Sequence, residues 1–232
     1  MERFYSFRKM VVLELAKIKL SNVSRYATEM ENTNVFKLEE LTRNAEVVER
    51  NLTEEEKDLY WEYMIDEFHE LEKIFPSLLR YSVVVLTYSI IEEALLGIVK
   101  PHIVNSLTDK EKIELNKEVE LNKKCKRNLS KYKGANFLET LGNYMNKMMG
   151  IEFPFDSEEW NFIMDLDTIR NNIVHCNGKI NDDKDPEYIQ EVIDSYDLIT
   201  LSSNDEMVIE REFVTYMIDH VGSLFSKLIN QN

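Results

Sequence analysis

The chain has few of the residues that interrupt helices, with only 6 glycines and 4 prolines among 232 residues. Sandwiches and barrels need a turn about every 8–12 residues, so this scarcity excludes them and indicates long helices. Two cysteines, Cys125 and Cys176, are too few for a disulfide framework, and neither belongs to a Cys-x-x-Cys pair. We therefore expect an all-α protein in a reducing, cytoplasmic setting.

Long uncharged apolar runs are missing as well. The most apolar stretch runs from Tyr81 to Ile91 and is closed by Glu92 and Glu93. It is shorter than the roughly 20 residues that span a bilayer, so we expect a buried core helix and no membrane partner. The first twenty residues are charged throughout and lack the apolar segment of a secretory signal.

The composition is that of a folded protein, because 44% of the residues are hydrophobic and 31% are charged. Acidic side chains outnumber basic ones 43 to 28, which gives a net charge of −15. Dedicated duplex-DNA binders are usually basic, so duplex DNA is not an expected partner.

Helical spacing and capping patterns predict an α-helical bundle. We expect breaks at residues 31–34, before Pro76 and at Pro101, and a polar loop over residues 181–187. A short β-hairpin should precede the C-terminal helix. The expected helices cover residues 2–30, 35–50, 53–75, 77–100, 135–149, 156–176 and 212–229, with another beginning near Thr108, and the expected hairpin pairs residues 199–201 with 207–209.

One segment of the helix over residues 156–176 carries side chains suited to phosphoryl chemistry, Arg170-Asn171-x-x-x-His175. Asn171 and His175 lie ~40° apart on one helix face, and Asp167 is placed to orient Arg170 through an i,i+3 pair. Cleavage of RNA by its own 2′-hydroxyl needs proton transfer, which His175 can perform. The fork of Arg170 suits the phosphate, and this chemistry needs neither metal nor cofactor.

The Arg170–His175 segment resembles the Arg-x(4–6)-His motif of the HEPN superfamily. Further similarities are the stretch from Arg80 to Glu92, which resembles the Tyr-Ser-x-x-Glu helix of HEPN-like nucleases, the Gly178 stop, the hairpin and the final helix. The resemblance covers residues 53–232 and leaves residues 1–52 as an N-terminal helical extension.

This resemblance implies a helical bundle that forms a homodimer in which two motifs meet, with metal-independent ribonuclease activity in active members. Such members often act in toxin–antitoxin or anti-phage systems, so an antitoxin or regulatory protein is an implied partner. It also implies that His175 transfers protons, Arg170 contacts the phosphate, Asn171 positions the substrate and Glu92 supports the site. Asn177 stands where some toxin members have the tyrosine that accepts a nucleotide.

Several alternatives stay open. Arg170 and His175 could be a surface arginine and a helix-capping histidine, and Glu92 could form an ion pair with Arg80 or Lys100. The basic segment, residues 123–133, could guide RNA through Lys123, Lys124, Lys126 and Arg127, or could be a solvated loop. The whole protein could be a catalytically inactive HEPN module that dimerises or binds a partner protein.

Overall fold

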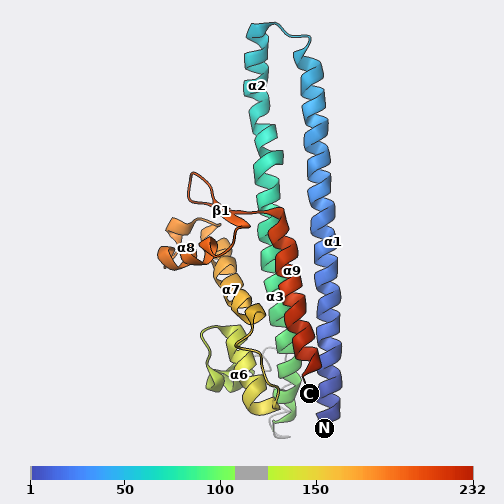
Figure 1. Ribbon diagram of the computed structural model, residues 1–232, viewed down its shortest axis with the longest axis vertical. Coiled ribbons are helices and arrows are strands. Elements are labelled where there is room, and N and C mark those ends of the chain that lie inside the picture. The colour runs from blue at the N-terminus through green and yellow to red at the C-terminus, as the bar shows by residue number, and fades with distance from the viewer. Residues whose placement is uncertain (1, 108–124, 232) are drawn as a thin grey trace. The chain divides into compact units, whose positions relative to one another are not determined.

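The described part of this computed structural model, residues 2–107 and 125–231, consists of helices and one two-stranded sheet (Figure 1). The all-α fold with a small hairpin before the C-terminal helix is thereby confirmed. In chain order, the elements are α1 (Glu2–Glu49), α2 (Glu54–His69), the π-helix η1 (Glu70–Ile74), α3 (Phe75–Asn105), a helix at 125–129, the 3₁₀ turn η2 (Ser130–Tyr132), α6 (Phe137–Met149), α7 (Glu158–Cys176), the 3₁₀ turn η3 (Ile180–Asp182), α8 (Pro186–Asp194), β1 (Ile199–Leu201), β2 (Met207–Ile209) and α9 (Arg211–Asn230).

Backbone contacts group the chain into two compact units, and α1, α3, α7 and α9 contribute to both. Unit 1 comprises Met1–Leu20, Thr87–Asp165 and Ile218–Asn232, and unit 2 comprises Ser21–Leu86 and Leu166–Met217. The assignment of residues 53–232 to a HEPN-like domain with a 1–52 extension stays a prediction.

The first helix continues through residues 31–34, so the predicted break there is wrong. None of these four residues is Gly or Pro, and their side chains have partners that keep the helix intact. The carboxylate of Glu31 is buried against Arg80, and the Thr33 hydroxyl donates to the Glu29 carbonyl. Asn34 donates through its side-chain amide to the Leu71 carbonyl. A polar run therefore marks tertiary hydrogen bonds here and not a loop.

The helix that begins at Glu54 also continues past its predicted end before Pro76. A capping box of Thr53 and Glu56 forms at its start, since the Thr53 hydroxyl accepts from the Glu56 amide and the Glu56 carboxylate accepts from the Thr53 amide. Just before Pro76 the helix widens into the π-helix η1, and this accommodates the proline. At the end of η1 the Phe75 amide donates to the Glu70 carbonyl. In the i→i+5 pattern of a π-helix, the Leu71 carbonyl would accept from the amide of residue 76. Pro76 has no amide hydrogen, and the Asn34 side chain donates to the Leu71 carbonyl instead.

The predicted end of the next helix at Pro101 is also wrong, because α3 reaches Asn105. Proline fixes φ at a helical value, and its cost inside a helix is one lost hydrogen bond together with a clash between its ring and the carbonyl of residue i−4. Between Glu54 and Asn105 the helix is long and apolar enough to cross a membrane by length and composition. Of its most apolar window, 56% is buried within the protein, as in the core helix of a soluble protein.

The core of unit 1 joins one stripe from each of several helices. In the first helix, Leu13, Ala16 and Leu20 are buried, whereas Leu15 and Ile18 are exposed. One face of α6 is buried at Leu138, Leu141, Tyr144 and Met145, and Gly150 ends that helix in the left-handed conformation. The first half of α7 and the second half of α9 close this core with Ile163, Val221, Leu224 and Leu228, and Lys227 of α9 donates to Glu159 of α7.

Unit 2 contains the hairpin, which forms in the predicted place with Ile199 opposite Ile209. The predicted loop over residues 181–187 is only partly correct, because η3 and the start of α8 fall within it. Asp185 caps α8 by accepting from the Tyr188 amide, and Pro186 occupies its first turn. This Asp-Pro signal was present in the sequence.

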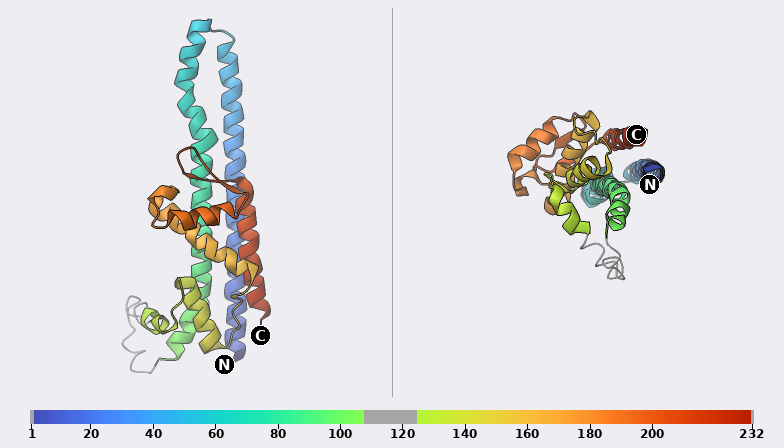
Figure 2. Two further views of the ribbon diagram at one scale, coloured as in Figure 1. Left: turned by 60° about the vertical axis from the view of Figure 1, so that its left-hand side comes forward. Right: turned by 90° about the horizontal axis from the view of Figure 1, so that it is seen from below.

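Unit 2 also contains a pair of antiparallel helices, which we call the helical arm and define as residues 34–75. Its two halves lie side by side and are joined by the turn at residues 50–53 (Figure 2). Asn34 and Leu71 are hydrogen-bonded where the arm meets the rest of unit 2.

Candidate functional site

The Arg170–His175 segment lies in the last two turns of α7. Ser157 caps the start of this helix, because its hydroxyl accepts from the Trp160 amide. The helix is held in place by a fully buried apolar stripe, which consists of Ile163, Leu166 and Ile169. It ends at Cys176, after which the backbone turns through two left-handed residues, Asn177 at φ 52° and Gly178 at φ 82°. The predicted Asn-Gly stop is therefore confirmed.

The structure brings Arg170 and Asn171 together. Both side chains are half-buried, and Nη1 of Arg170 donates to Oδ1 of Asn171 at 2.8 Å. His175 is exposed one turn further along, and its imidazole forms no hydrogen bond or ion pair with any residue of the described ranges. The helix end thus presents an oriented guanidinium and an accessible imidazole.

The neighbouring Asn172 is the residue of this segment whose role sequence reasoning missed. Its side chain is 0% exposed, and Nδ2 donates to the Lys179 carbonyl at 3.2 Å and to the Asp183 carboxylate at 2.8 Å. Burial alone would raise the pKa of Asp183, but hydrogen bonds from Asn172 and from the amides of Asp185 and Lys184 hold it below its ordinary value. Asn172 thus fixes the loop behind the helix end. A polar residue next to the apolar stripe was the signal that could have revealed it.

Two consecutive residues of α3 fix the same helix end from the other side. The Tyr81 hydroxyl donates to the Met207 carbonyl at 2.5 Å, and Arg80 Nη1 donates to the Ile209 carbonyl at 2.8 Å. The Met207 amide donates to the Gly178 carbonyl, so the edge of β2 that faces away from β1 is bonded to α3 and to the turn after α7. An edge strand otherwise presents a row of unpaired N–H and C=O groups, and here α3 and the turn cover them. Arg80 and Tyr81 therefore have a structural function here.

The predicted supporting residues are less well defined. Asp167 lies on α7 one turn before Arg170, half-buried, so its predicted role in orienting that arginine stays open. Glu92 is half-buried on α3 in unit 1, whereas Arg170 belongs to unit 2. The alternative partner Arg80 is engaged by Glu31, with Nε to Oε1 at 2.7 Å. The support that Glu92 was predicted to give the site stays a prediction.

No protein-family model, curated protein or solved structure matches this chain. The resemblance to the HEPN superfamily therefore stays a prediction from the motif and its surroundings.

The predicted RNA-guiding residues lie partly outside the described residues, because Lys123 and Lys124 fall in the undescribed stretch. Lys126 and Arg127 are exposed on the helix at 125–129, which buries Cys125 and Leu129. Burial raises the pKa of the Cys125 thiol, although the charge of Lys100 opposes this. The chain at this point is thus an anchored helix that presents cations, and not a plain solvated loop.

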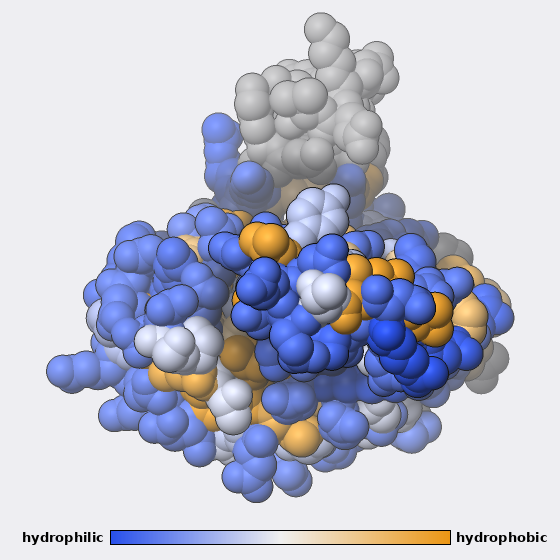
Figure 3. Space-filling model, turned by 90° about the horizontal axis from the view of Figure 1, so that it is seen from above, coloured by the Kyte–Doolittle hydropathy of each residue, from blue (hydrophilic) through white to orange (hydrophobic). Residues whose placement is uncertain are grey.

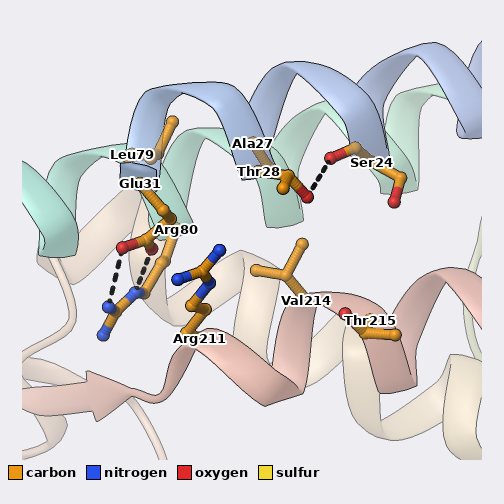
Figure 4. A pocket seen from close by; sticks show the side chains of 9 residues that line it. All are labelled: Ser24, Ala27, Thr28, Glu31, Leu79, Arg80, Arg211, Val214 and Thr215. Atoms are coloured by element: carbon orange, nitrogen blue, oxygen red, sulfur yellow. Dashed lines mark hydrogen bonds and ion pairs between the residues drawn. The ribbon is translucent and has the colours of Figure 1, made fainter. Parts of the chain in front are cut away.

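A shallow pocket in unit 2 contains the buried ion pair of Glu31 and Arg80 (Figure 4). Both carboxylate oxygens of Glu31 accept from Arg80, and Arg211 extends beside them while donating to Asn32. The pocket is lined by Ser24, Ala27, Thr28, Glu31, Leu79, Arg80, Arg211, Val214 and Thr215. Its arginines serve mainly to hold α1, α3 and the hairpin together. Across the described ranges, no three His, Cys, Asp or Glu side chains are placed to hold a metal ion.

Proposed function

We propose that this protein is a metal-independent endoribonuclease of the HEPN type. The observation that carries the proposal is the end of α7, where Arg170 is oriented by Asn171 and His175 is exposed one turn away. A buried, hydrogen-bonded framework of Asn172, Tyr81 and Gly178 surrounds that helix end.

The proposed reaction uses the substrate's own 2′-hydroxyl. An imidazole accepts the 2′-hydroxyl proton, the 2′-oxygen bonds to phosphorus, and the phosphorus–5′-oxygen bond breaks as that oxygen gains a proton. The products are a 2′,3′-cyclic phosphate and a 5′-hydroxyl. The Arg170 guanidinium stabilises the charge that develops on the phosphate oxygens. Since one imidazole cannot be base and acid at once, we propose a homodimer in which two copies of the motif share a cleft.

The direct test is cleavage of single-stranded RNA in EDTA by the full chain. We expect 2′,3′-cyclic or 3′-phosphate ends from the wild type and no cleavage by His175→Ala. His69→Ala is the matched control, since His69 is also an exposed histidine on a helix. Equal activity of all three proteins would contradict the proposal, and so would activity that is lost in EDTA and restored by magnesium.

A mixing experiment tests the shared cleft. His175→Ala and Arg170→Ala subunits are each expected to be inactive alone. Mixed at micromolar concentration, they should form heterodimers that retain one intact His and one intact Arg and recover part of the activity. A monomer in sedimentation that cleaves RNA at the wild-type rate would contradict the shared site.

The biological setting that we propose is a cytoplasmic toxin or anti-phage effector, held in check by an antitoxin or regulatory protein. The second candidate function is a catalytically inactive HEPN module that dimerises or binds another protein. The net charge of −15 favours that alternative, because it repels RNA. A wild-type protein that neither binds nor cleaves RNA would decide for it.

A further inference from the structure

The helical arm, residues 34–75, carries a large share of the protein's negative charge. It contains 13 acidic and 5 basic side chains, a net charge of −8 out of the −15 of the whole chain. Two paired helices bury only the stripe along which they meet. The arm accordingly buries just Ala45, Met64 and Leu71, and many of its large apolar side chains remain exposed.

Three of its apolar side chains form a continuous stripe on one side of the second half of the arm. Trp61, Ile65 and Phe68 are spaced by four and three residues, so they share one face. The rings of Trp61 and Phe68 lie 5.7 Å apart, with Ile65 between them in the sequence. Ile65 is 63% exposed and Trp61 is 36% exposed. Seen toward the turn at residues 50–53, hydrophobic surface interrupts a mostly hydrophilic exterior (Figure 3).

A row of carboxylates borders the stripe. Asp58 and Glu62 each lie three residues before a stripe residue on the same α-helix, which places both beside the stripe. Both are exposed, and neither forms an ion pair with any residue that the structure describes. An apolar strip edged by unneutralised acids has the pattern complementary to a basic amphipathic helix.

We propose that this stripe, Trp61–Ile65–Phe68 with its acidic border, binds a basic amphipathic helix of a partner protein. The partner's apolar face would cover the three stripe residues, and its Lys or Arg side chains would pair with the bordering carboxylates. A third helix would convert the two-helix arm into a three-helix bundle. Charge disfavours the other occupants of this stripe, because a second copy would bring −8 against −8 and RNA is itself a polyanion. The proposal is independent of the ribonuclease proposal.

The experiment uses the full chain and a synthetic probe, a peptide of about 18 residues with Leu at i, i+4 and i+7 and Lys elsewhere. Trp61 reports binding directly. The other tryptophan of the chain, Trp160, is only 4% exposed, so its emission should not change. We expect the peptide to blue-shift the Trp61 emission and to protect it from iodide quenching.

Matched variants separate the stripe from general charge attraction. Ile65→Ser should weaken peptide binding by about tenfold or more, whereas Leu59→Ser should change it less than about twofold. Leu59 is a fair control because it lies on the same helix and is 68% exposed, against 63% for Ile65. A peptide of the same composition with scrambled order, which retains the charge but lacks the apolar face, should bind at least about tenfold more weakly.

Three results would each overturn the proposal. Ile65→Ser and Leu59→Ser could weaken binding equally, the scrambled peptide could bind as tightly as the amphipathic one, or Ile65→Ser could dissociate a dimer of the chain in sedimentation. The last result would assign the stripe to a second copy. Circular dichroism of both variants confirms that the helices remain, so loss of binding cannot be mistaken for unfolding.

Discussion

The hydroxyl of Tyr81 occupies the space in which a side chain at Gly178 would begin. A Cβ at Gly178 would overlap the tip of the tyrosine ring, and Tyr81 cannot swing away without losing its hydrogen bond to the Met207 carbonyl. Gly178 also has φ +82°, which disfavours other residues. Tyr81 of α3 and the turn that follows α7 are thus sterically complementary.

The first prediction concerns this fit. Gly178→Ala should destabilise the protein by roughly 3 kcal/mol, since backbone strain of about 1–2 kcal/mol adds to the overlap with Tyr81. Gly150→Ala is the control, because Gly150 also has a positive φ of 66° but has no atom near the position of a Cβ. Urea unfolding should show a loss of only about 1 kcal/mol for the control. Similar losses for the two variants would contradict the fit.

The second prediction concerns the Tyr81 hydroxyl at high pH. Burial raises the pKa of Tyr81 from 10.0 to about 12. A side-chain hydrogen bond with Ser77 opposes this increase, and the negative charge of Glu206 adds to it. A raised folded-state pKa means that the contribution to stability is present below pH 10 and is lost as pH rises through about 12. Tyr81→Phe should cost about 1 kcal/mol at pH 7, and this difference should shrink above pH 10. Parallel stability–pH curves for the two proteins would contradict this.

The third prediction concerns the π-helix. Asn34→Ala should cost about 1 kcal/mol, because the Leu71 carbonyl loses the donor that replaces the missing amide of Pro76. In a Pro76→Ala background the backbone can supply that donor, so the same change should cost much less. The double-mutant cycle measures this coupling by denaturant unfolding. Equal costs in both backgrounds would show that Asn34 acts independently of Pro76.

The fourth prediction concerns acid stability at the loop behind the site. The pKa of Asp183 is lowered from 3.8, so its carboxylate stabilises the fold above that value, and this contribution is lost as pH falls through the folded-state pKa. Asp183→Asn removes the titrating carboxyl group. The difference in free energy of unfolding between this variant and the wild type should narrow below pH 3.8. Asp182→Asn is the control, because Asp182 is an exposed neighbour. A constant difference from neutral to acid pH would contradict the prediction.

The fifth prediction concerns the cations on the helix at 125–129 and rests on the proposed ribonuclease function. Changing Lys126 and Arg127 to Gln should weaken RNA binding. It should also reduce the slope of log affinity against log salt by the equivalent of roughly two phosphate contacts. Lys17→Gln and Lys57→Gln together serve as the control, since they remove the same charge from elsewhere. Identical salt slopes for both double variants would show that only net charge matters.

The sequence by itself determined the helical class, the hairpin and several helix ends. The capping box at Thr53, the left-handed glycines at 150 and 178 and the stripes of α7 and α9 are local signals. They depend on backbone geometry and periodicity within a few residues, which a single sequence contains in full. The Arg170–His175 spacing is local in the same way, since one helix fixes it.

Only the tertiary structure decided which polar runs are loops and which are buried contacts. Glu31 pairs with Arg80, and Asn34 donates to the Leu71 carbonyl. These partners lie far away in the sequence, and the contacts keep this part of the chain helical. Asn172 likewise has its structural role because Asp183 returns to it. Local propensity disfavours asparagine in helices by less than about 1 kcal/mol, whereas a buried hydrogen-bonded partner contributes as much or more. Long-range partners therefore override local preference at the positions where sequence reasoning placed breaks.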